Sequence, residues 1–407
     1  MAKSLFQEEL DRRWKAGADG ISSLVDWLLL GCARQGASDL HLEPRPDEVL
    51  FRWRRDGHLS DLGVGQGPLR VNVVQRIKVL AGMQTYRTDI PQDGRIPGTG
   101  VHGVTDMRVS VYPAALGEKV VIRFFHGRGS IISGVHLDGG QAAVEWTLAS
   151  LGLVPRDVTR LAAFLRRPQG MVLLTGPAGS GKTTTLYTCM LKIIEQSAGH
   201  RQIVTIEDPV ERIVPGVTHT ELKPTAGLDY AAALKALLRQ DPEVIMIGEI
   251  RDGVTAQVAV QAALTGHLIL STLHAPSAPE VLLRLLHLGV EPYLTASVVS
   301  AVVEQRLVRR LCACRLAVPG DESAVEPFRP NGCEECAHTG YRGRILVAQL
   351  LPVEGPVREC VLGRKDSLEL MSAAARVGWR GLWAQGVELA AEGSTTYAEL
   401  RRVLIEQ

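Results

Sequence analysis

The sequence of 407 residues has no apolar run long enough to cross a membrane, and its first residues carry no signal-peptide core. The nearest candidate, 24–30, falls well short of the ~20 residues that a membrane-spanning helix needs. The 45 Lys and Arg residues balance the 44 Asp and Glu residues, so a general nucleic-acid-binding surface is not required. We therefore predict a cytoplasmic protein that meets a membrane only through its partners.

Aromatic residues and cysteines are also scarce. Seven cysteines in a chain of this size argue against a disulfide framework, and an aromatic content of 5% argues against the stacking loops of a single-strand-binding protein. The remainder, 45% hydrophobic and 22% charged, is typical of an ordinary folded protein. Because single cores stop growing near ~250–300 residues, the length predicts two or three domains.

The strongest signal is an apolar run, 171–175, that leads into a glycine-rich loop and then into an apolar-periodic segment. This loop matches G-x-x-x-x-G-K-[ST], in which glycines allow turns that a Cβ forbids and backbone N–H groups converge on phosphate oxygens. Lys182 supplies charge to the phosphates and Thr183 a hydroxyl to Mg²⁺. A chance glycine turn is the alternative, but the strand and helix context favours nucleotide binding. The predicted contacts are Gly176, Pro177, Gly179, Ser180, Gly181, Lys182, Thr183 and Thr184.

Strands and helices alternate after this loop. The alternation predicts an α/β fold with a mostly parallel sheet covered on both faces, and ligand at the carboxyl ends of its strands. The expected strands are 171–175, 202–206, 243–247 and 268–272, and the expected helices are 182–196, 229–239, 253–264 and others from 278 onward.

The segment before the loop has a different pattern. Apolar residues at helical spacing predict two short lead-in helices, and alternating residues then predict strands, with Asp56-Gly57 as a hairpin turn. The Gly-rich stretch 127–140 predicts a linker. The expected divisions are a lead-in at 1–33, an α+β domain at 34–130, a linker at 131–145 and a nucleotide domain at 146–407.

Carboxylates follow two of the predicted strands. Glu207 and Glu211 could polarise water or hold metal-bound water, or could belong to a helix cap with a solvated acidic turn. Glu249 follows the strand 243–247 and is a candidate to contact Mg²⁺ or to orient the attacking water. Any strand can end in Glu, so this second signal depends on the phosphate loop.

Histidines and arginines offer further candidates. His267 and His274 flank one predicted strand, where they could sense the γ-phosphate or simply cap a buried strand. Arg95, Arg108 and Arg123 could offset charge on a transferring phosphoryl group, although most surface arginines do nothing of the kind.

Four cysteines fall in two close pairs, Cys312 with Cys314 and Cys333 with Cys336. Four thiolates arranged in this way fit a closed, tetrahedral Zn²⁺ site in an insert at about 308–345. Free buried thiols remain the alternative, because the first pair is separated by one residue instead of the usual two.

Taken together, these residues resemble the ATPases of type II secretion and type IV pilus assembly. Many ordered matches are far more specific than any single one. The matching segments are 36–44, 91–95, 107–110, 117–119, the phosphate loop, 206–211, 239–242, 248–252, 265–274, 305–312 and 339–344.

The resemblance implies a RecA-like ATPase domain, preceded by a smaller α+β (PAS-like) domain and followed by a helical C-terminal region with the tetracysteine insert. It also implies a homo-hexamer, peripheral at the inner membrane, that hydrolyses ATP to drive a platform protein with associated cytoplasmic assembly proteins, without nucleic acid. The implied site residues are Glu249, Glu207 and Glu211 for hydrolysis, His267 and His274 for nucleotide sensing, Arg95 and Arg108 for the triphosphate, and Thr183 with Glu249 for Mg²⁺.

Two features bear on how the protein docks and on which kind of secretion or pilus system it serves. Family members of the assembly and secretion type usually carry a sizeable N-terminal docking domain, whereas about 33 residues precede the shared core here, so we expect any docking to use the two lead-in helices. Retraction motors lack the cysteine insert, so its presence favours assembly or secretion. The main alternative is a nucleic-acid translocase or helicase on the same core, and a further one is a protein that binds ATP without hydrolysing it.

Overall fold

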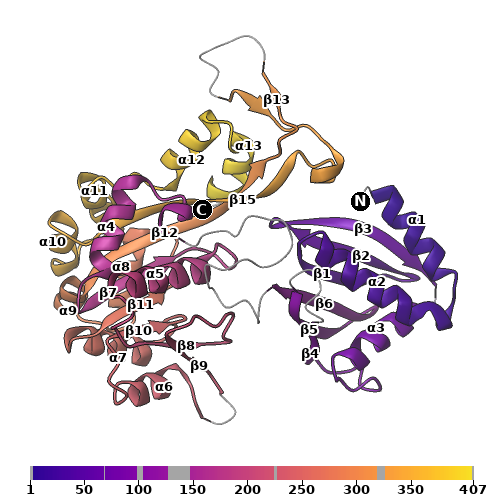
Figure 1. Cartoon of the computed structure of the whole chain (residues 1–407), viewed down its shortest axis with the longest axis horizontal. Coiled ribbons are helices and arrows are strands. Elements are labelled where there is room, and N and C mark those ends of the chain that lie inside the picture. The colour runs from indigo at the N-terminus through magenta and orange to yellow at the C-terminus, as the bar shows by residue number, and fades with distance from the viewer. Residues whose placement is uncertain are drawn as a thin grey trace. The chain divides into compact units, whose positions relative to one another are not determined.

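The computed structural model describes residues 3–67, 69–98, 104–126, 147–223, 227–318 and 326–405. The chain divides into two compact units: one contains residues up to 130 together with 312–315 and 330–343, and the other contains the rest (Figure 1). The linker predicted at 131–145 lies outside the described residues.

The first unit contains a six-stranded antiparallel sheet with the strand order β3-β2-β1-β6-β5-β4. Asp56 and Gly57 both have positive φ and form the two-residue turn between β2 and β3, which confirms the predicted hairpin. The strands are β1 (Ala37–Pro44), β2 (Glu48–Arg55), β3 (His58–Gln66), β4 (Gln92–Pro97), β5 (Val104–Ala114) and β6 (Gly117–His126).

Three helices pack in the same hydrophobic core as this sheet: α1 (Lys3–Trp14), α2 (Ile21–Arg34) and α3 (Leu69–Leu80). Leu40 and Leu42 alternate along β1 with residues of the opposite face, so one face of the sheet receives the apolar side chains of the helices. The two predicted lead-in helices are therefore present, and Leu10 and Leu28 are buried within this core.

The second unit is built on a seven-stranded sheet with the order β15-β12-β7-β11-β10-β8-β9, in which β12, β7, β11, β10, β8 and β9 run parallel (Figure 1). The predicted mostly parallel α/β fold is confirmed. The strands are β7 (Gly170–Thr175), β8 (Ile203–Glu207), β9 (Val217–Glu221), β10 (Val244–Ile247), β11 (Leu268–Thr272), β12 (Val299–Leu311) and β15 (Tyr341–Pro352).

Helices cover both faces of this sheet. Alternate residues of each strand therefore pack against the helices of one face or the other. Met171 and Leu173 pack with α6 to α11, whereas Val172 and Leu174 pack with α4 and α5. The helices are α4 (Pro155–Leu165), α5 (Lys182–Gln196), α6 (Tyr230–Leu237), α7 (Gly253–Leu264), α8 (Ala278–His287), α9 (Pro292–Val298), α10 (Pro356–Leu362), α11 (Ser367–Arg376), α12 (Leu382–Ala391) and α13 (Tyr397–Leu400).

Two long strands, β12 and β15, lie where the sequence predicted only helices. Most residues of β12 are buried, so the run lacks the polar alternation of a half-exposed strand. Without that alternation, periodicity alone does not distinguish a buried strand from a buried helix. A short hairpin of β13 (Leu316–Ala317) and β14 (Phe328–Arg329) lies between β12 and β15 along the chain.

One buried ion pair tests the packing of the first unit. Lys78 on α3 has no exposed surface, and its Nζ donates to Glu118 Oε1 at 2.7 Å and to the backbone oxygen of Arg87 at 2.6 Å. We predict that Glu118→Ala lowers the free energy of unfolding by about 3 kcal/mol, because it leaves the buried ammonium without its counter-ion. Urea denaturation measures this change, and the exposed Glu8→Ala variant is the control. A Glu118→Ala protein as stable as the wild type would contradict the assignment.

Candidate nucleotide-binding site

The phosphate loop connects the central strand β7 to α5. Gly176, Gly179 and Gly181 have φ of 152°, 73° and 88°, a conformation that residues with a Cβ rarely adopt. A Cβ on Gly176 would also lie 2.4 Å from the backbone oxygen of Gln305. Glycine is therefore required here both by the turn and by the close approach of β12.

Lys182 begins α5 and folds back over the loop. Its Nζ donates to the backbone oxygens of Gly176, at 2.7 Å, and Pro177, at 2.8 Å. The pKa of Lys182 is lowered, chiefly by burial and further by the charge of Arg306, against the opposing effect of the Glu249 carboxylate. Thr183 follows in the first turn of the helix, beside the partial positive charge of the helix N-terminus.

Glu249 lies just after β10, two strands from the phosphate loop, with β11 between them. Its side chain is 18% exposed and is paired with Arg251. The Nε2 of His274, which follows β11, lies 3.7 Å from the other carboxylate oxygen. The structure thus places Lys182, Glu249 and His274 at the carboxyl ends of the parallel strands.

His267 lies at the other end of these strands, where they begin. It precedes β11, and its backbone oxygen accepts the N–H of Gly170, the first residue of β7. Its ring Nδ1 lies 2.9 Å from the backbone oxygen of Ala262, at the end of α7. Within this chain, the structure does not bring His267 to the phosphate loop.

The two predicted glutamates after β8 have different environments. Glu207 is 3% exposed and accepts hydrogen bonds from Tyr187, Thr205 and His219. Glu211 is exposed, in the irregular segment between β8 and β9. The pair therefore offers one enclosed and one solvent-facing carboxylate.

The arginines of the first unit form a row across three strands. Arg95 is the cross-strand partner of Arg108, and Arg108 is the partner of Arg123. Arg95 Nε donates to Asp106 Oδ2 at 3.0 Å, Arg123 Nε donates to Asp39 Oδ1 at 2.9 Å, and the guanidinium of Arg108 lies over the ring of Phe125. This row lines a hollow on the sheet together with Asp93, and two of its three guanidinium groups are paired with carboxylates.

Three residues of β12 that were not predicted as site residues lie beside the phosphate loop and the segment after β11. Gln305 Nε2 donates to the backbone oxygen of Ser180 in the phosphate loop at 2.7 Å. Glu304 Oε2 accepts the N–H of Ala278 at 2.9 Å, and Arg306 donates to the backbone oxygen of Pro276 at 3.4 Å. All three residues are about 5% exposed or less. They connect the phosphate loop to the segment that follows His274, and their strand was not predicted at all.

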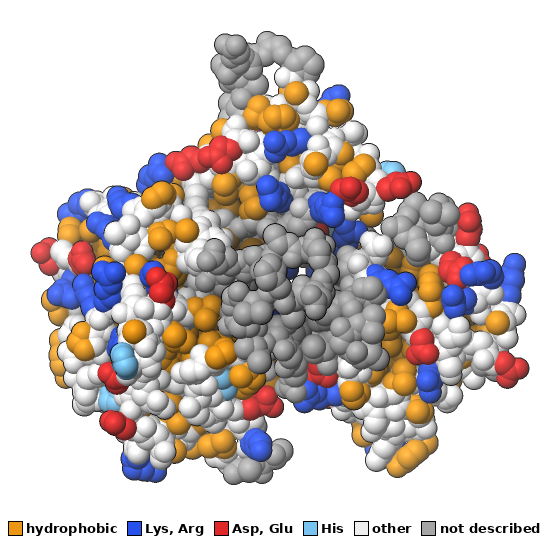
Figure 2. Space-filling model, in the orientation of Figure 1, with side chains coloured by type: hydrophobic (Ala, Val, Ile, Leu, Met, Phe, Trp, Pro, Cys, Tyr) orange, Lys and Arg blue, Asp and Glu red, His pale blue; other side chains and the backbone are white. Residues whose placement is uncertain are grey.

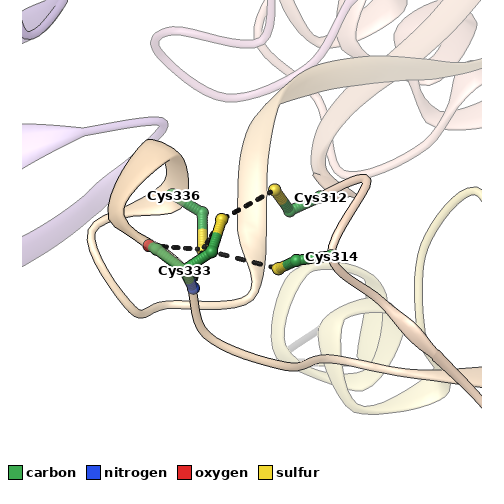
Figure 3. Close-up of side chains that lie close together, drawn as sticks. All are labelled: Cys312, Cys314, Cys333 and Cys336. Atoms are coloured by element: carbon green, nitrogen blue, oxygen red, sulfur yellow. Dashed lines mark hydrogen bonds between the residues drawn. The ribbon is translucent and has the colours of Figure 1, made fainter.

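The four cysteines of the insert converge (Figure 3). Their sulfur atoms all lie within 4.8 Å of one another, with Cys312–Cys333 at 3.8 Å, Cys314–Cys336 at 3.9 Å and Cys333–Cys336 at 3.7 Å. A tetrahedral Zn²⁺ with bonds of ~2.3 Å places its sulfurs about 3.8 Å apart. The single residue between Cys312 and Cys314 therefore does not prevent a tetrahedral set.

Backbone groups favour an anionic sulfur in this cluster. Burial by itself would raise the pKa of the Cys336 thiol, but the N–H groups of Cys333 and Gly340 donate to its sulfur and the pKa falls to about 6, whereas the pKa of the neighbouring Cys314 thiol is raised, chiefly by desolvation. The thiolate is the form that binds metal.

These features define a class of protein. A phosphate loop between a central parallel strand and a helix, with an acidic residue after a nearby strand, is the site of a P-loop nucleotide-binding protein. Within that class the chain belongs to the type II/IV secretion system protein family, whose model matches residues 15–402. The predicted family is confirmed.

Comparisons with individual proteins also point to this family. The chain is 41% identical to the type II secretion system protein HxcR of Pseudomonas aeruginosa over 381 residues, covering 93% of this chain and 76% of that protein. It is 37% identical to the type IV pilus assembly ATPase PilB of Myxococcus xanthus over 410 residues, covering 97% and 69%. The ATPase DotB of Legionella pneumophila has the same fold, with a TM-score of 0.64, 18% identity and coverage of 96% and 95%.

Glu304 makes stability depend on pH. Burial raises its pKa from 4.5 to about 7, against the N–H of Ala278 and the charge of Arg306, which lower it, while Glu280 adds to the increase. The native state therefore holds an extra proton between about pH 5 and pH 7, and the free energy of unfolding falls as pH rises through that range. We predict that Glu304→Gln removes this dependence and is more stable than the wild type above pH 7. Urea denaturation across this range, with the exposed Glu392→Gln as control, checks it; parallel pH profiles for wild type and variant would contradict it.

Proposed function

We propose that this chain is the ATP-hydrolysing motor subunit of a type II secretion or type IV pilus assembly machine. The observation that carries the proposal is the placement of Lys182 and Glu249 after the parallel strands β7 and β10, at the same ends of these strands as a phosphate loop of the required conformation. Membership of the type II/IV secretion system protein family supports the machine.

The residues at these strand ends suit phosphoryl transfer to water. Lys182 exchanges its backbone oxygen partners for phosphate oxygens, and the loop N–H groups surround the phosphates. Glu249 orients the attacking water and accepts its proton. His274, whose Nε2 lies 3.7 Å from Glu249, would respond to the γ-phosphate in this proposal. We assign Arg95 and Arg108 to the triphosphate as well, supported by the row that they form with Arg123.

Mg²⁺ fits the same strand ends. The hydroxyl of Thr183 and the carboxylate of Glu249 are the oxygen ligands that this ion prefers, and Glu249 is largely enclosed. When bound, Mg²⁺ neutralises charge on the phosphate oxygens.

A motor of this kind requires several copies of the chain and a partner protein at the membrane. We propose a homo-hexamer that acts on an inner-membrane platform protein and its cytoplasmic assembly proteins, so the chain would be peripheral at that membrane. Within the described residues, none of the helices combines the length and apolar character needed to cross a bilayer. The four-cysteine cluster would hold a structural Zn²⁺ and pin the insert that follows β12.

ATP turnover tests the motor. We expect Mg-dependent hydrolysis by the wild type, loss of nucleotide binding in Lys182→Ala, and retained binding with turnover lowered roughly a hundredfold or more in Glu249→Gln, because only the latter keeps the phosphate contacts. Fluorescent ATP analogue binding and phosphate release measure the two steps, and Glu392→Gln is the control.

The same assay separates the alternative functions. Figure 2 shows Lys and Arg side chains interspersed with Asp and Glu over the visible face, which does not favour a nucleic-acid groove there. Stimulation of turnover by single-stranded DNA would instead support a translocase, and tight binding without any turnover would support a non-hydrolysing ATP-binding protein.

Metal analysis tests the cysteine cluster. We predict about one Zn²⁺ per purified chain and its loss in Cys333→Ser, together with a lower unfolding temperature, because the thiolate set is then incomplete. The matched control is Cys32→Ala, a buried cysteine remote from the cluster in sequence. Wild-type protein that is free of metal, yet unaffected by added Zn²⁺, would contradict the site.

A further inference from the structure

The carboxylate of Glu207 is the centre of a buried hydrogen-bonded cluster at the end of β8. Its Oε2 accepts from Tyr187 Oη at 2.6 Å, and its Oε1 accepts from Thr205 Oγ1 at 2.6 Å and lies 2.8 Å from His219 Nδ1. A general base must reach the water that it deprotonates. Glu207 is 3% exposed and surrounded by three partners, so its position suits an anchor rather than a base.

The neighbours of His219 define its tautomer. The backbone N–H of Val214 donates to Nε2 at 3.0 Å, so this nitrogen is an acceptor. The ring proton is then on Nδ1, which donates it to Glu207. The side chain is 4% exposed. His219, on β9, therefore ties the backbone at Val214 to the carboxylate at the end of β8.

The segment 210–214 depends on side chains for its backbone hydrogen bonds. It belongs to neither a helix nor a strand, and alternate N–H groups along it donate to side-chain acceptors. Two of these acceptors also donate to Glu207. The three bonds are Val210 N to Glu221 Oε2 at 3.2 Å, Arg212 N to Tyr187 Oη at 3.2 Å and Val214 N to His219 Nε2 at 3.0 Å.

Tyr187 connects this cluster to the phosphate loop. It lies on α5, which begins at Lys182, so the hydroxyl and the phosphate-binding residue belong to one rigid helix. The segment 210–214 carries the exposed Glu211. Tyr187 and His219 therefore tie this segment to α5 and β9, while Glu221 holds the N–H of Val210 beside Glu211.

We propose that His219 and Tyr187 are positioning residues for ATP hydrolysis: anchored on Glu207, they bind the backbone at Val214 and Arg212 and hold segment 210–214, with the carboxylate of Glu211, in a fixed place relative to the phosphate-loop helix. This inference rests on the ATP hydrolysis proposed above. The cluster makes none of the hydrogen bonds of the phosphate loop itself, so it governs turnover more than nucleotide affinity. A small displacement of a reacting group costs far more in rate than in binding.

Three variants test this role. His219→Leu removes both ring contacts, Tyr187→Phe removes the hydroxyl that joins Glu207 to Arg212, and His219→Gln keeps one donor and one acceptor. We expect kcat to fall roughly tenfold to a hundredfold in the first two, with KM for ATP within about threefold of wild type, and largely to recover in His219→Gln. The matched controls are the exposed residues His200→Gln and Tyr293→Phe, which should retain wild-type turnover.

The outcomes separate the two proposals. A wild-type protein that does not hydrolyse ATP overturns the proposed motor function. An active wild type, with Tyr187→Phe and His219→Leu turning over at the same rate, overturns the positioning role, as does a kcat in His219→Gln as low as that in His219→Leu. If His219→Leu does not fold, Tyr187→Phe, which keeps the ring in place, decides between these results.

Discussion

The second unit depends on the close approach of the phosphate loop to β12. The backbone oxygen of Gln305 would lie 2.4 Å from any Cβ on Gly176, and the side chain of the same Gln305 holds the oxygen of Ser180. A loop that must present its N–H groups to a ligand cannot also use them to hold itself together. In this chain, Gln305 on β12 contributes part of that support, and only a glycine at position 176 leaves room for the close approach of this strand.

The same arrangement recurs around the site. At the carboxyl ends of the strands, buried side chains from neighbouring strands add to the backbone hydrogen bonds of the loops. Thr175 Oγ1 donates to the oxygen of Ala275 at 2.8 Å and accepts its N–H at 3.2 Å, and Glu304 accepts the N–H of Ala278. Because these acceptors and donors lie within the packed sheet, the loops that they hold have defined positions without regular secondary structure of their own.

The local pattern predicted much of the fold. Helix α5 was predicted at 182–196 and is observed over the same residues, because the phosphate loop defines its start and apolar periodicity defines its face. Strands β7, β8, β10 and β11 were predicted within one residue at each end, since each is a short apolar run between turn signals. β12 was missed because burial on both faces removes the alternation by which a strand is recognised.

The sequence by itself determined the ligand class, the family and the order of the nucleotide-binding elements, because glycine, lysine and threonine at fixed spacing have few other uses in a strand-loop-helix context. Only the tertiary structure decided which polar residues surround Glu207 and which support the phosphate loop. Neither His219 nor Gln305 was predicted to contact this site, and Gln305 lies 125 positions from the Ser180 that it contacts. Their roles arise from strand order and register, which place distant side chains within hydrogen-bonding distance, and no local pattern encodes that distance.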